Sequence, residues 1–469
     1  MFLVMPDRKA GRWRCRMGRN LLVAQSGGPT AAINATLAGV IEQALKYGKG
    51  HTEETIDKIY GAAYGIQGVL KEDFIDLAAK LGELAREEEF RDLTGQAGEP
   101  VREKSGEHPA AEQQTADGTD LRTVLSVLSR TPAAALGSCR FKLQDPEKDP
   151  SEFERIIEIF KKYNIGFFVY IGGNDSMDTV WKLSVYIRKQ GIRDITVIGA
   201  PKTIDNDLYG IDHCPGFGSA AKYIATSCAE LERELEVYDT PYVIIVEMMG
   251  RNAGWLTAAA ALAAGQNSQV PYLIYLEEKA FDMNAFIGDV RGELKSGKSL
   301  IVAVSEGIRD RSGKMICAYE TKAQSRDAFG HIIASGAGKV LEETVQSNIG
   351  CKTRYIELNL LQRCAGHLLS RTDVLESMEL GRNAVRLAVS GSNGSMSSLR
   401  RLPGAGYQVV YEASDLSEIA NREKKVPLEW ISSEGNGVTQ ECIDYLRPLV
   451  AGEMSCAFAG GVPKYVVLK

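Results

Sequence analysis

A recurring unit constrains this chain more than any other feature: a short apolar run ends in a glycine-containing turn, and an amphipathic segment follows. The first two copies are NLLVAQSGGPTAAINATLAGVIEQAL (20–45) and IGFFVYIGGNDSMDTVWKLSVYI (165–187). Two more copies and two further apolar runs extend the pattern, at 195–207, 242–256, 271–278 and 299–308. Short buried runs separated by helices are typical of a parallel sheet covered on both faces. The pattern therefore predicts an α/β fold with a mainly parallel sheet.

The glycine turns also predict where a ligand binds. In a parallel sheet the carboxyl ends of the strands lie at one edge, and ligands bind beyond that edge. Each glycine-rich turn in these repeats follows an apolar run, so we expect the turns to gather there. A chain of 469 residues is long enough to form two or three domains with large cores.

Three segments depart from this pattern. Residues 1–19 carry Arg and Lys without an apolar core of signal-peptide length, and we expect an extension before a fold that begins near Asn20. Residues from about 80 to 120 are polar and rich in Glu, Gly and Pro, which predicts an inserted surface loop. Residues 391–408 favour an exposed hairpin or loop before a strand resumes.

Charge and composition exclude several classes of protein. The net charge of −6 provides no basic field for nucleic acid, and no uncharged apolar run is long enough to span a membrane. The nine cysteines are scattered without a C-x-x-C pair, and the five histidines have no metal-ligand spacing. We therefore expect a cytoplasmic protein with neither a nucleic-acid nor a membrane partner.

Two loops are candidates for phosphate chemistry. In QSGGPT (25–30) the glycines let the backbone approach an anion at a helix N-terminus, although a turn without a ligand explains this stretch equally well. In PKTIDND (201–207) Asp205 suits a general base and Lys202 suits a phosphoryl group. Taken alone, an Asp-Asn-Asp sequence is explained better by a loop that caps the next helix.

Isolated charges after other strands are more ambiguous. Arg251 in EMMGR suits phosphate through its planar guanidinium, but an ion pair is the commoner role of an arginine. Arg354 and Arg363 fit either a sugar phosphate or a solvated face, and Glu306 fits either sugar hydroxyls or a helix cap. The ASGAGKV stretch (334–340) lacks the spacing of a Walker A loop, which favours a helix start or a structural turn.

In this order the motifs resemble the phosphofructokinase family. The resemblance spans roughly residues 20–375 and is carried by SGGPTAAINA, LGSCRFKL, IGGNDSMDT, PKTIDND, EMMGR, SEG and LQR. It implies two Rossmann-like domains with mainly parallel sheets and the active site in the cleft between them. The expected division is a larger donor-binding domain, a sugar-phosphate domain, and a C-terminal segment that completes both, at 20–205, 206–375 and 376–469.

The family transfers a phosphoryl group to the 1-hydroxyl of fructose 6-phosphate with Mg²⁺. The resemblance implies that Asp205 is the general base, supported by Asp207 and Thr203, and that Arg251 stabilises the transition state. The remaining sugar-phosphate ligands would be Ile204, Met249, Gly250, Glu306, Arg363 and, reaching a neighbouring subunit, Arg354. The donor ligands would be Gly27, Gly28, Arg140, Gly173 and Lys202. Such a set acts by positioning and electrostatics.

Two positions sort phosphoryl donors within the family. Members that use ATP have glycine at both, whereas members that use inorganic pyrophosphate have Asp and Lys, which here are Asp175 and Lys202. Asp175 would repel the α-phosphate of ATP, and Lys202 would offset the charge of the leaving phosphate. The resemblance therefore implies a reversible pyrophosphate–fructose 6-phosphate 1-phosphotransferase of glycolysis and gluconeogenesis.

Several positions depart from the family pattern. Asn174 replaces a magnesium-associated Asp, so the metal would depend on Asn174, Asp175, pyrophosphate oxygens and water. Leu360 replaces a sugar-phosphate His, and Tyr242 stands where regulated bacterial members have Arg. Ala38 and Glu42 replace two arginines that bind nucleotide effectors, which predicts an enzyme without nucleotide allostery.

Other functions stay open at this point. An ATP-dependent 6-phosphofructokinase and a non-catalytic regulatory subunit share the same fold, although intact Asp205, Asp207 and Arg251 argue against the second. A dehydrogenase is disfavoured because no G-x-G-x-x-G follows a strand. The expected partners are pyrophosphate and fructose 6-phosphate, and the expected assembly is a homodimer or a tetramer.

Overall fold

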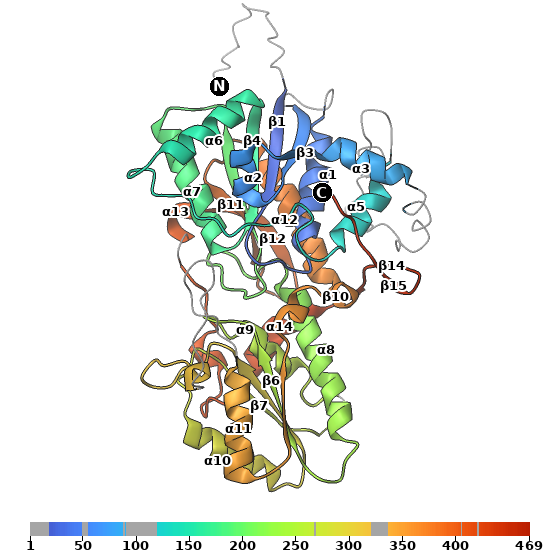
Figure 1. Ribbon diagram of the computed structural model, residues 1–469, viewed down its shortest axis with the longest axis vertical. Helices are drawn as coiled ribbons and strands as arrows, with labels where there is room; N and C mark the ends of the chain where they lie inside the picture. Colours follow the sequence, from blue (N-terminus) through green and yellow to red (C-terminus); the bar gives the residue numbers. More distant parts are fainter. Residues whose placement is uncertain are drawn as a thin grey trace, which may run out of the picture.

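The chain forms two α/β units that lie one above the other along the long axis of the molecule (Figure 1). The computed structural model describes residues 18–48, 55–87, 90, 120–266, 269–319, 336–404, 406–419 and 422–469. Residues 1–17 of the expected N-terminal extension, and residues 88, 89 and 91–119 of the expected insert, lie outside the described residues.

The larger unit is built on a seven-stranded sheet with the order β12-β11-β5-β4-β1-β2-β3. The five central strands run parallel, and the two edge strands β3 and β12 are antiparallel to their neighbours. Its strands are β1 (Arg19–Gln25), β2 (Ile56–Ala62), β3 (Phe74–Asp76), β4 (Ile165–Gly172), β5 (Thr196–Pro201), β11 (Ser395–Arg401) and β12 (Val409–Asp415).

The smaller unit is built on a four-stranded sheet with the order β7-β8-β6-β9, and all of its strands are parallel. These strands are β6 (Val243–Met248), β7 (Tyr272–Tyr275), β8 (Leu300–Ser305) and β9 (Thr353–Glu357). Four shorter strands form two separate pairs: β10 (Leu369–Ser370), β13 (Glu453–Met454), β14 (Ala457–Ala459) and β15 (Val462–Lys464). The predicted α/β class with mainly parallel sheets is confirmed.

Helices cover both faces of each large sheet. Leu21 and Val23 of β1 enter one core, whereas Leu22 and Ala24 enter the core on the opposite face. The helices of the larger unit are α1 (Ile33–Lys46), α2 (Gly65–Lys71), α3 (Leu77–Arg86), α5 (Arg122–Ser129), α6 (Ser151–Lys162), α7 (Asn174–Lys189), α12 (Arg371–Val389) and α13 (Leu416–Ile419). Those of the smaller unit are α8 (Phe217–Leu235), α9 (Trp255–Ala258), α10 (Met283–Leu294), α11 (Ala337–Ile349) and α14 (Gln440–Leu446).

The C-terminal part of the chain contributes to both units. Strands β11 and β12 extend the large sheet beyond β5. Val426, Cys442 and Leu446 instead pack into a core of the smaller unit with residues of α8, α9 and β6. The last hundred residues therefore connect the two units.

Two expectations about surface segments were wrong in part. Residues 80–86 belong to α3 rather than to a loop, because Leu81 and Leu84 are buried on its inner side. The hairpin expected in 391–408 is present and its turn is exposed at Pro403 and Gly404, but its first strand β11 is buried between β5 and β12, with Met396 and Leu399 in the core.

The Walker-like stretch is a helix start, as expected: Gly336, at φ 96°, immediately precedes α11. Among the described residues, no helix has the length and apolar character needed to cross a membrane.

Candidate active site

A cavity of about 860 Å³ lies where the two units meet. One wall comes from the turns that follow β1, β4 and β5, which are neighbours in the large sheet. The other wall comes from the turns after β6 and β8 of the small sheet. The glycine turns therefore gather at the carboxyl edges of the strands, as the sequence predicts.

On the first wall, the Gly27–Gly28 turn lies close to two cations, Lys202 and Arg363. Lys202 Nζ donates a hydrogen bond to the carbonyl of Gly28 at 2.6 Å. A Cβ atom on Gly27 would lie 3.1 Å from Lys202 Nζ, and one on Gly28 would lie 3.1 Å from Arg363 Nη1. Gly27 has φ +76°, a backbone conformation that favours glycine. The absence of side chains at Gly27 and Gly28 therefore lets both cations lie close to the turn, where an anion in the cavity would meet them.

Burial lowers the pKa of Lys202 to about 8, although Asp205 opposes the shift. The positive charges of Arg363 and Arg140 lower the pKa of this lysine further. A bound anion would lie among these cations and restore the charged form of the lysine. This wall is suited to a small, highly charged phosphate compound.

Asp175 lies in the first turn of α7, where the helix N-terminus would otherwise favour an anionic ligand. Its carboxylate lines the cavity, is half-exposed, and lies 3.9 Å from Lys142 Nζ. An anionic group that extends to this end of the cavity would meet a fixed negative charge.

The loop after β5 carries two carboxylates into the cavity. Asn206 adopts φ 54° between Asp205 and Asp207, and both aspartates line the cavity. The amide N–H of Asp205 donates to Thr203 Oγ1 at 3.1 Å. Burial raises the pKa of Asp205, and the negative charge of Asp207 raises it further. A carboxylate with a raised pKa is a stronger proton acceptor, which suits a general base.

The second wall places polar groups opposite that loop. Glu306 accepts a hydrogen bond from the N–H of Gly250 at 3.3 Å. Burial raises the pKa of Glu306 to about 8, and the charge of Asp205 raises it further. Arg251 also lines the cavity, and its Nε has no hydrogen-bond partner among the described residues. This wall therefore offers both a cation and a hydrogen-bonding carboxyl group to a second substrate.

Most of the residues predicted from the sequence meet in this cavity. It is lined by Gly27, Gly28, Arg140, Gly173, Asn174, Asp175, Lys202, Thr203, Ile204, Asp205, Asp207, Met249, Arg251, Glu306 and Arg363. Gly250 is not among the lining residues, but its N–H fixes Glu306. Arg354 is exposed on β9 and does not line the cavity.

Two of the departures noted above lie apart from the cavity. Leu360 is 54% exposed and does not line it. Tyr242 directly precedes β6, at the end of the strand opposite Met249, and is buried beneath Lys352, whose Nζ lies 4.4 Å from its ring centroid. Neither position contributes a side chain to the cavity in this chain.

Seven lining residues had not been predicted: Pro29, Ser176, Asn252, Ala253, Arg309, Met315 and Glu423. Pro29 and Ser176 lie inside predicted motifs, and Asn252 and Ala253 directly follow one, so the sequence could have suggested all four. Arg309 and Met315 follow the SEG motif, and the bridge between them turns the chain back toward the cavity. Glu423 follows no motif and reaches the cavity because its segment pairs with Leu208.

The site also contains oxygen atoms suited to a hard cation. Asn174 Nδ2 donates to Asp207 Oδ2 at 3.2 Å, whereas Asn174 Oδ1 and Asp205 Oδ1 are buried without a partner among the described residues. Amide and carboxylate oxygens suit Mg²⁺. Within the part of the chain that the structure describes, no three His, Cys, Asp or Glu side chains form a metal cluster. A magnesium ion here would therefore rely on water and substrate for most of its coordination.

Comparison with known proteins agrees with this geometry. The family model described as phosphofructokinase matches residues 20–388. The pyrophosphate–fructose 6-phosphate 1-phosphotransferase of Methylococcus capsulatus is 37% identical over 452 residues, 96% of either chain. A crystal structure of pyrophosphate-dependent phosphofructokinase from Nitrosospira multiformis matches with a TM-score of 0.76 and 36% identity, again over 96% of each chain. A second, from Marinobacter aquaeolei, matches with a TM-score of 0.76 and 34% identity over 95% of each. The chain therefore belongs to the phosphofructokinase family.

Proposed function

We propose that this chain reversibly transfers phosphate from inorganic pyrophosphate to the 1-hydroxyl of fructose 6-phosphate. The products are fructose 1,6-bisphosphate and phosphate, and the reaction is a step of glycolysis and gluconeogenesis. The observation that carries the proposal is the pair formed by Asp175 and Lys202, which line the same cavity at the donor turns. The names of relatives that are 36–37% identical over 96% of the chain support it.

The donor side explains the choice of pyrophosphate. Pyrophosphate would lie in the cavity against the Gly27–Gly28 turn and Lys202, which is itself hydrogen-bonded to the Gly28 carbonyl, and the backbone N–H groups and the ammonium would offset its charge. A nucleotide would have to extend a third phosphate toward Asp175 at the start of α7. The negative carboxylate therefore disfavours ATP more than it disfavours the shorter donor.

The chemical step uses groups of both walls. Asp205 accepts the proton of the 1-hydroxyl while that oxygen attacks the terminal phosphorus of pyrophosphate. The bond from phosphorus to the bridging oxygen breaks, and inorganic phosphate leaves. Lys202 offsets the charge of the leaving group, and Arg251 stabilises the transferred group in the transition state. In the reverse direction Asp205 returns the proton.

Binding of the sugar phosphate falls to residues that line the second wall and its edges. Glu306 accepts hydrogen bonds from sugar hydroxyls, and Met249 contributes apolar contact. Arg363 supplies positive charge from the side of Gly28. Arg354 reaches the site of a neighbouring subunit in our proposal, because it is exposed on β9 of its own subunit. This role requires a homodimer or a larger assembly.

Mg²⁺ is the proposed cofactor. Asn174 offers a buried oxygen without a partner among the described residues, and Asp175 follows it in the first turn of α7. When bound, the ion neutralises charge on the pyrophosphate oxygens. The protein residues orient both substrates around that charge and hold the proton of the acceptor.

We also propose a cytoplasmic enzyme without nucleotide allostery. Glu42 is buried in α1 and forms an ion pair with Arg382 Nη2 of α12 at 2.8 Å. Position 42 therefore offers an effector phosphate a carboxylate, already paired with Arg382, instead of a positive charge. Ala38, on the preceding turn of α1, is buried as well.

The double variant Asp175→Gly/Lys202→Gly tests the donor assignment. We expect it to lose pyrophosphate turnover and to gain ATP turnover, because the repulsive carboxylate and the pyrophosphate ligand are removed together. The measurement is kcat/KM with each donor at matched Mg²⁺, with the two single variants as controls. A double variant that keeps the wild-type preference for pyrophosphate contradicts the assignment.

A further inference from the structure

A short C-terminal segment, residues 423–426, crosses behind the catalytic loop. Glu423 forms an antiparallel bridge with Leu208, and the N–H of Lys424 donates to the carbonyl of Asp207 at 2.8 Å. Trp255 Nε1 of the smaller unit donates to the carbonyl of Lys424 at 3.0 Å. The segment is therefore hydrogen-bonded both to the loop that carries the catalytic carboxylates and to the start of α9, which follows Arg251 in the chain.

The side chain of Lys424 continues this connection. Its Nζ donates to the carbonyl of Asp212 at 2.6 Å, to the carbonyl of Ile211 at 3.2 Å, and to Asn206 Oδ1 at 3.2 Å. An ammonium has three donors, and three oxygens accept them here. Lys424 does not line the cavity, so it does not touch substrate.

Asn206 forms the turn between the two aspartates. It holds φ 54°, in the left-handed region, which Asn tolerates better than most residues other than glycine. Its Oδ1 also accepts from the N–H of Cys214 at 2.9 Å, and its Nδ2 donates to Tyr445 Oη at 3.0 Å. The turn at Asn206 sets the directions in which its two neighbours, Asp205 and Asp207, leave the backbone.

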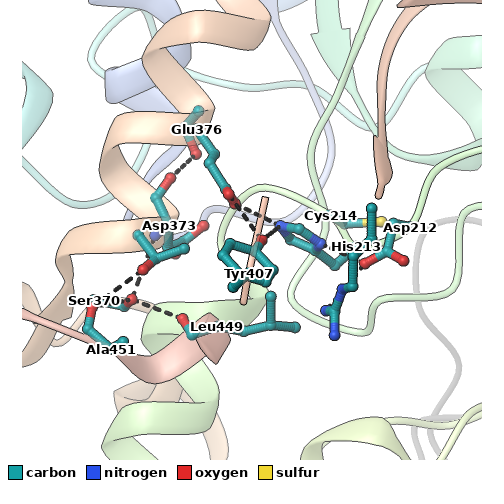
Figure 2. Close-up of polar contacts among 12 residues, drawn as sticks. Asp212, His213, Cys214, Ser370, Asp373, Glu376, Tyr407, Leu449 and Ala451 are labelled. Carbon is teal, nitrogen blue, oxygen red and sulfur yellow. Dashed lines mark hydrogen bonds and ion pairs between the residues drawn. The ribbon is translucent and has the colours of Figure 1, made fainter. Parts of the chain in front are cut away.

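One of the residues that accept from Lys424, Asp212, is itself fixed through its side chain by a buried polar cluster, which Figure 2 shows. The ring of His213 lies between two carboxylates, with Nδ1 2.8 Å from Asp212 Oδ1 and Nε2 2.6 Å from Glu376 Oε2. Tyr407 Oη donates to Glu376 Oε1 at 2.8 Å. Since Glu376 belongs to α12, the cluster fixes residue 212 to a long helix of the larger unit.

We propose that Lys424 is a positioning residue that holds the Asp205–Asn206–Asp207 turn in the orientation needed for phosphoryl transfer. The proposal rests on the proposed function, because that function gives Asp205 its role as general base. Lys424 acts through Asn206 and the two carbonyls rather than on substrate. Its removal would leave Asn206 Oδ1 with one donor fewer and would loosen the segment against the loop.

The adjacent lysine provides a matched control. Lys425 is exposed and donates to Glu277 Oε1 at 2.7 Å, away from the catalytic loop. It does not line the cavity. Lys424→Met and Lys425→Met therefore remove the same charge from neighbouring positions, and only the first removes contacts with the turn.

The kinetic test is steady-state turnover with pyrophosphate and fructose 6-phosphate. Lys424→Met is expected to lower kcat by about 10- to 100-fold, with each KM changed by less than about 3-fold, because a misplaced base impairs the chemical step more than binding. Lys425→Met is expected to keep the wild-type kcat. A wild-type kcat in Lys424→Met, or a loss confined to KM, overturns the proposal.

Hydrogen–deuterium exchange gives a readout that does not depend on turnover. Amides of residues 205–212 are expected to exchange faster in Lys424→Met than in wild type and Lys425→Met, while β4 stays protected. Unchanged exchange in this segment overturns the proposal for Lys424. Failure of the wild type to use pyrophosphate is a different result, which refutes the proposed function and leaves the exchange test valid. If Lys424→Met does not fold, Lys424→Gln takes its place. Because Gln keeps two donors on a shorter side chain, a smaller loss of kcat and a smaller rise in exchange are expected, and a wild-type kcat together with unchanged exchange overturns the proposal.

Discussion

At the scale of single residues, the cavity holds acid and base groups whose pKa values are displaced in opposite directions. Burial and the charge of Asp207 raise the pKa of Asp205, so this base loses its proton at a higher pH than an exposed carboxylate. Burial lowers the pKa of Lys202 to about 8, so this lysine loses its charge at a lower pH than an exposed amine. The enzyme needs Asp205 as a carboxylate and Lys202 as an ammonium. Both groups carry these charges only at pH values between the pKa of Asp205 and that of Lys202.

We therefore predict a bell-shaped pH profile for kcat/KM with pyrophosphate. Activity rises with pH as Asp205 deprotonates and falls above about pH 8 as Lys202 loses its positive charge. In Lys202→Arg the guanidinium stays charged, so the alkaline decline is expected to disappear while the maximum rate is reduced. Rates measured across the pH range in wild type and this variant check it, and an unchanged alkaline decline in Lys202→Arg contradicts the role of Lys202.

At the scale of elements, helices α1 and α12 approach each other closely enough that their glycines have no room for a side chain. A Cβ on Gly39 would lie 2.0 Å from the carbonyl oxygen of Met378, and one on Gly381 would lie 2.1 Å from that of Thr36. Both clashes are with backbone atoms, which cannot rotate away. This contact fixes α1, the helix that follows the Gly27–Gly28 turn, against the large sheet.

We predict that Gly39→Ala lowers the free energy of unfolding by about 1–3 kcal/mol, because overpacking forces the two backbones apart. Gly292→Ala in α10 is the matched control, since a Cβ there meets nothing within 4 Å. That control is expected to gain up to about 1 kcal/mol from helix propensity. Urea unfolding measures both variants, and equal stabilisation of both would show that the helices do not pack as closely as described.

The elements also show what the sequence could predict. The turns after β1, β4 and β5 were predicted because glycine and charge follow apolar runs directly along the chain. The location of β11 was not predicted, because its place between β5 and β12 depends on a pairing across about two hundred residues. The approach of Glu423 and Lys424 to the catalytic loop left no local signal for the same reason.

At the scale of the whole molecule, the cavity belongs to neither unit alone. Asp205 comes from the large sheet, Glu306 from the small one, and the segment at residue 423 returns to the cavity after the chain has completed both sheets. The resemblance to a family could predict which residues meet because it summarises a fold already known. Composition and periodicity could predict only the class of fold.

The effector positions give a prediction at the same scale. Glu42 is paired with Arg382 across α1 and α12, so this position carries a buried carboxylate where the resemblance led us to expect no effector site. We expect hyperbolic saturation by fructose 6-phosphate that ADP leaves unchanged. Initial rates across a range of fructose 6-phosphate, with and without ADP, measure this. A sigmoidal curve that ADP shifts would contradict the proposed absence of nucleotide allostery.

The central claim is that this chain uses pyrophosphate rather than ATP. The most direct measurement is formation of fructose 1,6-bisphosphate from fructose 6-phosphate by the purified wild-type protein, with either donor at matched Mg²⁺. We predict turnover with pyrophosphate, almost none with ATP, and formation of pyrophosphate when fructose 1,6-bisphosphate and phosphate are supplied instead. Turnover with ATP and none with pyrophosphate would contradict the account.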